Sequence, residues 1–311
     1  MTVLPFNIPG FNPNVTPPKV KFPAGATDCH AHVFGPQSSF PYTPGAAYIA
    51  PDATPNDYAR MLTSIGCQRA VLVQPSVYGA DNACMVAAMK SGVFNFRGIA
   101  VVEPNVTDKE LQTLHDAGVR GIRINLASET EGLKLSDGER LAPRLKAMGW
   151  HLQFFLDLEK MPEAEDQLAS LKINIVIDHF AKCQAANGVD GAAFKALLRL
   201  VKRDNVWAKI MGAYFLSKQK PHYPDVTPLA QAMVAVAPER IVWGSDWPHP
   251  GARAKEISLR KKKRELRNRA ATTLAREAAL DAVSGAGPPW LAQTGPRHGS
   301  PQRRPLATGV L

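Results

Sequence analysis

The chain has 311 residues, of which 45% are hydrophobic and 7% aromatic, and its formal net charge is +10. This length allows one (β/α)8 barrel of roughly 250 residues with additions, or two smaller domains. No stretch approaches the ~20 continuous apolar residues of a membrane span, and the first residues lack the basic and apolar regions of a secretory signal. We therefore expect a cytoplasmic protein without a membrane partner.

The positive charge lies almost wholly in one segment. Residues 251–311 contain 13 Lys and Arg against 4 Asp and Glu, which leaves a net charge of +1 for residues 1–250. The run Arg260–Arg264 could contact a phosphate backbone, but it has no interleaved aromatic residues, and such runs are usually solvated helix faces. Nucleic-acid binding through this run is a remote alternative. Cys29, Cys67, Cys84 and Cys183 are scattered, so their spacing indicates neither a zinc knuckle nor a disulfide framework.

The first predicted strand carries two histidines on one side. Six prolines in residues 1–23 predict an extended amino-terminal arm, and a domain then begins near residue 24. In Asp28-Cys29-His30-Ala31-His32, alternate residues of an extended segment project the same way, so His30 and His32 share a face above Asp28. At the carboxyl end of a barrel strand they would lie at the mouth, where such barrels do their chemistry.

The rest of the chain to residue 250 alternates strands with helix-compatible segments. A helix follows Thr54 and ends at Gly66, Asp81-Asn82 caps the next, and Thr107 with Glu110 forms a capping box for a third. The predicted strands cover residues 28–32, 69–74, 97–103, 119–125, 151–157, 173–179, 205–211 and 240–246. The other predicted helices cover residues 141–148, 162–171, 192–202 and 226–236. Eight strands in this alternation predict a parallel sheet, here a (β/α)8 TIM-type barrel over residues 24–250.

The predicted catalytic residues follow apolar strands. The run from Ile173 ends in Asp178-His179, and the run from Arg240 ends in Asp246. Only closure of a barrel would bring the ends of the first and eighth strands together. His30, His32 and His179 could then either bind zinc, with Asp246 as a further ligand, or donate hydrogen bonds to a carbonyl group. Asp246 is the predicted general base for a water molecule.

Five segments of the chain resemble the amidohydrolase superfamily, and within it the branch of lactone hydrolases. They are residues 28–36, 73–82, 118–125, 177–179 and 243–250. The resemblance implies a barrel enzyme that opens a lactone ring. Two-metal members carry a carboxylated lysine where this chain has Asn125, and many one-metal members carry a histidine on strand five, where this chain has Phe155-Leu156-Asp157. The expected cofactor is therefore one Zn²⁺ at most, and a metal-free enzyme is the alternative.

The resemblance also implies the substrate contacts. Ser76 and Arg123 match positions that bind substrate carboxylates in the branch, and Gln153, Lys209 and Tyr214 are weaker candidates. Three other family contacts fail: a second arginine near Ala127-Ser128-Glu129, a tyrosine at Phe155 and an arginine near Phe215. A small anionic lactone from aromatic breakdown is thus expected, with 4-sulfomuconolactone, hydrolysed to maleylacetate and sulfite, or a related muconolactone preferred. The alternatives are 2-pyrone-4,6-dicarboxylate, or lactone isomerisation or decarboxylation on the same barrel.

The resemblance stops near residue 250. The acidic loop, eighth helix and closing segment of the family are not found in residues 251–311, whose last part is rich in Gly, Pro and Arg and resembles a shifted reading frame. This basic tail is therefore expected to be atypical. The sequence leaves the oligomeric state open.

Overall fold

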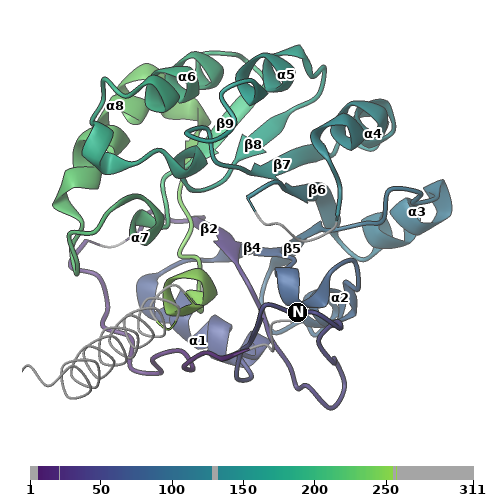
Figure 1. Ribbon diagram of the computed structural model, residues 1–311. Helices are drawn as coiled ribbons and strands as arrows, with labels where there is room; N and C mark the ends of the chain where they lie inside the picture. Colours follow the sequence, from purple (N-terminus) through teal and green to yellow (C-terminus); the bar gives the residue numbers. More distant parts are fainter. Residues whose placement is uncertain (1–5, 21, 128–131, 255–256, 258–311) are drawn as a thin grey trace, which may run out of the picture. The chain divides into compact units, whose positions relative to one another are not determined.

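The computed structural model describes residues 6–20, 22–127, 132–254 and 257. The expectations for the tail fall almost wholly outside these residues. Within them, eight parallel strands form one sheet in the order β10-β9-β8-β7-β6-β5-β4-β2 (Figure 1). The strands are β2 (Thr27–Ala31), β4 (Arg69–Val73), β5 (Phe96–Ala100), β6 (Val119–Asn125), β7 (His151–Phe155), β8 (Ile175–Ile177), β9 (Val206–Lys209) and β10 (Ile241–Val242).

Backbone hydrogen bonds close this sheet into a barrel between β2 and the segment after β10. The amides of Cys29 and His32 donate to the carbonyls of Trp243 and Trp247, at 3.0 and 2.8 Å, and the Asp246 amide donates to the His30 carbonyl at 2.9 Å. The predicted (β/α)8 barrel is therefore confirmed. Closure is also what places Asp246 directly beside the histidines of β2.

In the described part of the chain, seven helices surround the sheet and pack on its outer face (Figure 1). They are α1 (Pro55–Ile65), α2 (Ala83–Lys90), α3 (Asp108–Asp116), α4 (Leu135–Ala147), α5 (Ala164–Ser170), α6 (Ala192–Val201) and α8 (Thr227–Val236). The short helix α7 (Ala213–Leu216) follows β9 and contacts the turn at His179–Lys182. Short 3-10 turns are η1 (Ser76–Tyr78), η2 (His179–Lys182), η3 (Ala185–Asn187), η4 (Pro224–Val226) and η5 (Pro238–Arg240). Of the described residues, none belongs to a helix long and apolar enough to cross a membrane.

Both capping motifs that begin the first and third helices are confirmed. Thr54 and Thr107 each accept a hydrogen bond from the backbone amide three residues later, and the carboxylates of Asp57 and Glu110 each accept one from the amide of the cap residue. Each motif satisfies two amides that a helix start would otherwise leave unpaired. The sequence signature works here because its partners are only three residues apart.

One detail of the prediction is refined and one is wrong. Asn82 is the N-cap residue of α2, but its side chain exchanges hydrogen bonds with the backbone of Val101, at 2.7 and 3.1 Å, and Asp81 accepts from the Ala83 amide. Helix α4 begins at Leu135 rather than Leu141. Its first turn contains Gly138, which the helix needs because a Cβ there would lie 3.2 Å from the Ile124 side chain.

The amino-terminal arm is held by local contacts with the barrel. Its strand β1 (Phe6–Asn7) pairs in parallel with β3 (Tyr48–Ile49), which belongs to the long loop after β2. Phe11 packs against Trp247 with ring centroids 5.1 Å apart, and Phe22 packs against Trp243 at 5.3 Å. The arm thereby covers the outside of the seam where the barrel closes, and the loop carries Tyr48.

Candidate active site

Three imidazoles converge on one carboxylate oxygen at the carboxyl end of the barrel. Asp246 Oδ1 lies 3.6 Å from His30 Nε2, 3.4 Å from His32 Nε2 and 4.0 Å from His179 Nε2. All four residues are buried. They come from β2, from η2 at the end of β8 and from the segment after β10. The structure thus brings together the four residues that the sequence proposes for catalysis and for metal binding.

His32 is held as a hydrogen-bond acceptor towards this centre. Its Nδ1 lies 2.8 Å from the carbonyl oxygen of Val73, which can only accept, so Nδ1 carries a proton. When the ring is neutral, Nε2 is then bare, which means that it carries a lone pair and no proton, and it faces Asp246 Oδ1. Two acceptors at 3.4 Å need a proton or a cation between them. Metal-binding histidines are commonly oriented in this way: the ring nitrogen that does not bind the metal donates its N–H to a carbonyl or carboxylate.

His179 is placed by a strained turn. Residues His179 to Lys182 all have φ between 48° and 57°, a left-handed conformation that costs roughly 1–2 kcal/mol per residue. The ring packs against Gly212, where a Cβ would collide with His179 Nδ1. Gly212 itself has φ 70°. The sequence does not reveal this glycine as a site residue, because the contact joins two different βα segments.

The second oxygen of Asp246 is bound by Tyr214. The Tyr214 hydroxyl donates to Oδ2, so this residue, which the sequence proposes for substrate binding, lies in contact with the proposed base. Burial alone would raise the pKa of Asp246, but the nearby His179 and the contact with His32 hold that pKa below its usual value. Asp246 is therefore ionised near neutrality and available to accept a proton.

A buried polar cluster lies behind His30. Asp178 Oδ2 accepts hydrogen bonds from Gln153 Nε2 at 3.0 Å and from Arg123 Nε at 3.2 Å. Lys209 Nζ donates to Gln153 Oε1 at 2.8 Å and lies 3.1 Å from His30 Nδ1. Burial would raise the pKa of Asp178, but Lys209, His30 and Arg123 keep it well below its ordinary value. Gln153, proposed from the sequence for substrate binding, belongs to this cluster.

Ser76 and Arg123, the other proposed substrate contacts, line a cavity of about 360 Å³ at the mouth. The cavity is also lined by Gln74, Asn125 and the loop at residues 43–47. Arg123 is anchored on one side by Asp178 and its guanidinium lies 5.1 Å from the centre of the Phe155 ring. A fixed guanidinium at the wall of a cavity suits an anionic group of a small molecule.

Three aromatic residues near the mouth were not assigned roles by the sequence. Burial raises the pKa of the Tyr48 hydroxyl, Asp246 raises it further, and a hydrogen bond with Ser76 opposes both. Tyr48 therefore forms a hydrogen bond with Ser76 and lies close enough to Asp246 to be affected by its charge. Phe155 and Phe215 pack edge-on against His179, with ring centroids 5.1 and 4.9 Å away. They form an apolar wall at the two positions where the sequence has phenylalanines in place of a tyrosine and an arginine.

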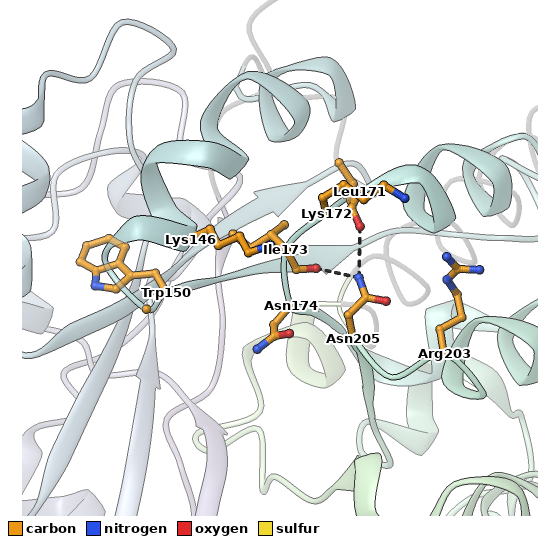
Figure 2. A pocket seen from close by; sticks show the side chains of 9 residues that line it. Lys146, Trp150, Leu171, Lys172, Ile173, Asn174, Arg203 and Asn205 are labelled. Carbon is orange, nitrogen blue, oxygen red and sulfur yellow. Dashed lines mark hydrogen bonds between the residues drawn. The ribbon is translucent and has the colours of Figure 1, made fainter.

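A second cavity of about 360 Å³ lies near the opposite ends of the strands, where β7, β8 and β9 begin (Figure 2). Lys146, Lys172 and Arg203 line it, together with Asn174 and Asn205, and none of its described lining residues carries a carboxylate or an imidazole. Because it offers no group able to take a proton from water, we place the chemistry at the mouth that holds Asp246.

The comparisons with known proteins agree with this geometry. The family model for amidohydrolases matches residues 27–272. A 2-pyrone-4,6-dicarboxylate hydrolase of Comamonas testosteroni is 37% identical over 247 residues, which cover 76% of this chain and 81% of that protein. A 4-sulfomuconolactone hydrolase of Hydrogenophaga intermedia is 32% identical, with 76% and 79% covered. A solved structure from Acinetobacter baumannii with bound citric acid aligns with a TM-score of 0.63 at 28% identity, covering 73% of this chain and 85% of the other.

Proposed function

This chain belongs to the amidohydrolase family, and from that premise we propose that it hydrolyses the ring ester of a small anionic lactone. The observation that carries the proposal is the convergence of His30, His32 and His179 on the ionised Asp246, next to a cavity walled by Arg123. The two relatives described above, which are named as hydrolases of a pyrone and of a muconolactone, support the same reaction.

The residues divide the steps of hydrolysis among them. Asp246 takes a proton from a water molecule, whose oxygen forms a bond to the lactone carbonyl carbon. The carbonyl oxygen gains negative charge and is stabilised by hydrogen bonds from the imidazole side. The bond from carbon to the ring oxygen then breaks, and the proton held by Asp246 passes to that leaving oxygen. The products are a hydroxyl or enol group and a new carboxylic acid, which ionises to a carboxylate near neutral pH and releases its proton to solvent.

The donor set fits one zinc ion. For tetrahedral zinc with bonds of about 2.0–2.1 Å, ligand atoms lie about 3.3 Å apart, which is close to the contacts of 3.4 and 3.6 Å between Asp246 and the β2 histidines. The bare Nε2 of His32 points into the same space. The ligand atoms of His30, His32 and Asp246 all lie within 4.8 Å of one another, so these residues would hold the ion when His30 Nε2 carries no proton, with His179 or water completing the set. A bound zinc would polarise the carbonyl and lower the pKa of water.

Arg123 and its surroundings favour a lactone with one well-bound anionic group. Arg123 and Ser76 are retained, whereas Phe155 and Phe215 replace the phenol and guanidinium that would hold a second carboxylate. Each hydrogen bond to a charged group contributes roughly 1.5–3 kcal/mol, so two losses weaken a dicarboxylate by several powers of ten. We therefore prefer 4-sulfomuconolactone, or a related muconolactone, over 2-pyrone-4,6-dicarboxylate.

The test compares kcat/KM for 4-sulfomuconolactone, muconolactone and 2-pyrone-4,6-dicarboxylate. Loss of ring absorbance together with release of one proton per turnover is expected, with the first or second substrate preferred. A clear preference for the pyrone would overturn the substrate assignment but keep the reaction. Loss of lactone without proton release would instead show isomerisation, and would overturn hydrolysis itself.

A further inference from the structure

Lys209 is a buried cation that the steps above do not use. It ends β9, only 2% of its surface is exposed, and its Nζ lies 2.8 Å from Gln153 Oε1, 3.1 Å from His30 Nδ1 and 3.2 Å from Asp178 Oδ1. An ammonium group has three protons and no lone pair. Lys209 Nζ thus lies within 3.2 Å of three polar atoms. Burial lowers the pKa of Lys209, and the negative charge of Asp178 opposes that shift and favours the cationic form.

The contacts of His30 Nδ1 show which way its hydrogen bond runs. Its distance to Asp178 Oδ1 is 3.3 Å, but within the described part of the chain that oxygen accepts no hydrogen bond of acceptable geometry. The hydrogen bond of His30 Nδ1 is the one with Lys209. Because an ammonium can only donate, Nδ1 must accept. In a neutral imidazole the proton then resides on Nε2.

We propose that Lys209 is a positioning residue that holds His30 with its proton on Nε2, so that His30 faces the reacting carbonyl as a hydrogen-bond donor. His30 Nε2 finds no hydrogen-bond partner among the described residues, and it points towards Asp246 Oδ1 at 3.6 Å. A carbonyl oxygen placed there would accept its proton. His32, held by Val73 with Nε2 bare, has the opposite polarity. This role rests on the proposed hydrolysis.

The same contact works against zinc. An Nε2 that carries a proton has no lone pair for a metal ion, and the positive charge of Lys209 sits against the other side of the ring. Metal-binding histidines ordinarily donate their second N–H to a carboxylate or carbonyl, as His32 does to Val73. Removing Lys209 would let His30 Nδ1 donate to Asp178 Oδ1 and turn the bare Nε2 towards Asp246.

The first experiment observes the proton directly. Two-bond ¹H–¹⁵N spectra of the histidine rings are recorded on the whole wild-type protein after zinc is removed with a chelator, without substrate, and His30→Gln assigns the signals of His30. The proposal expects the pattern of a neutral ring protonated on Nε2. A ring protonated on Nδ1 would overturn it. This measurement involves no turnover, so its failure is distinct from failure of the proposed hydrolysis.

The second experiment separates positioning from a merely structural role. In Lys209→Met we expect kcat to fall at least about tenfold with little change in KM, while zinc affinity rises about 10–100-fold. Lys195→Met is the control, because Lys195 lies in α6 and pairs with the exposed Asp190 at 3.0 Å rather than with a residue of the site. A Lys209→Met protein that folds but binds zinc no more tightly than the control would contradict the proposal. If Lys209→Met does not fold, the two-bond ¹H–¹⁵N spectrum of the wild-type protein alone supports or contradicts the proposal.

Discussion

Gly212 lies against the imidazole of His179, and a single added carbon at Gly212 would occupy the space of His179 Nδ1. The two residues belong to the turns after β9 and β8, so the glycine fixes where the ring stands relative to Asp246. The position of His179 therefore depends both on the lack of a side chain at Gly212 and on the left-handed turn that begins at His179.

Gly212→Ala should reduce kcat at least about tenfold, because the displaced ring moves away from Asp246. The matched control is Gly149→Ala, since Gly149 has a similar φ of 67° but open space where its Cβ would be. Both variants add backbone strain, and only Gly212→Ala disturbs His179. Steady-state kinetics and thermal unfolding of both proteins test this. Equal activity in the two variants would show that the close contact does not position the ring.

Asp246→Asn should lower turnover by about 10²-fold or more while the protein remains folded, because an amide cannot take a proton from water. Asp157→Asn is a suitable control, since Asp157 is also a buried carboxylate and contacts Lys182 rather than the histidines. Circular dichroism checks the fold. Near-native turnover of Asp246→Asn would remove this residue from the mechanism.

Arg123→Lys should raise KM for an anionic lactone about tenfold or more, because a lysine replaces the planar guanidinium by a point charge and loses the contact of Nε with Asp178. The effect on an uncharged lactone of similar size should be smaller. Arg120→Lys, on the same strand but bonded to the His115 carbonyl, serves as the control. If both substrates lose affinity equally, Arg123 does not bind the anionic group.

Elemental analysis of the purified protein should find at most one zinc per chain. The three imidazoles all face the same oxygen of Asp246, so these four residues can surround one ion. Asn125 stands where the two-metal members that the chain resembles carry a lysine. Two metals per chain would contradict this geometry. Activity measured before and after chelation shows whether the bound ion is needed.

The free energy of unfolding should fall as pH is lowered from 6.5 to 4, partly because of His151. Burial, with Lys209 adding to it, lowers the pKa of His151 from 6.5 to about 4. In this window the unfolded chain binds a proton at His151 that the folded chain does not, so stability is lost as pH falls. Urea unfolding at pH 5 and 7 should show a shallower pH dependence for His151→Gln than for wild type, and no change for the exposed His222→Gln. An identical slope in all three proteins would contradict the assignment.

The sequence was sufficient for the strands and for the side chains proposed as catalytic at their ends. The apolar runs that end in Asp178-His179 and in Asp246 report burial on both faces and polarity at the mouth, and the alternation of His30 and His32 lies within a single extended segment. The helix start at Thr54 and the capping box at Thr107 were equally readable, because each involves residues three positions apart. Local patterns thus determined which elements form and which side chains point to the mouth.

The tertiary structure decided what lies behind and beside those side chains. Lys209 meets His30 across 179 positions of sequence, Tyr214 meets Asp246, and Tyr48 reaches Ser76 from a loop. Such contacts depend on the stagger of the strands and on barrel closure, which bring residues from different βα units within hydrogen-bond distance. The periodicity of a single strand contains no information about that distance, so the hydrogen-bond partners of His30 and His32 are visible only in the folded barrel.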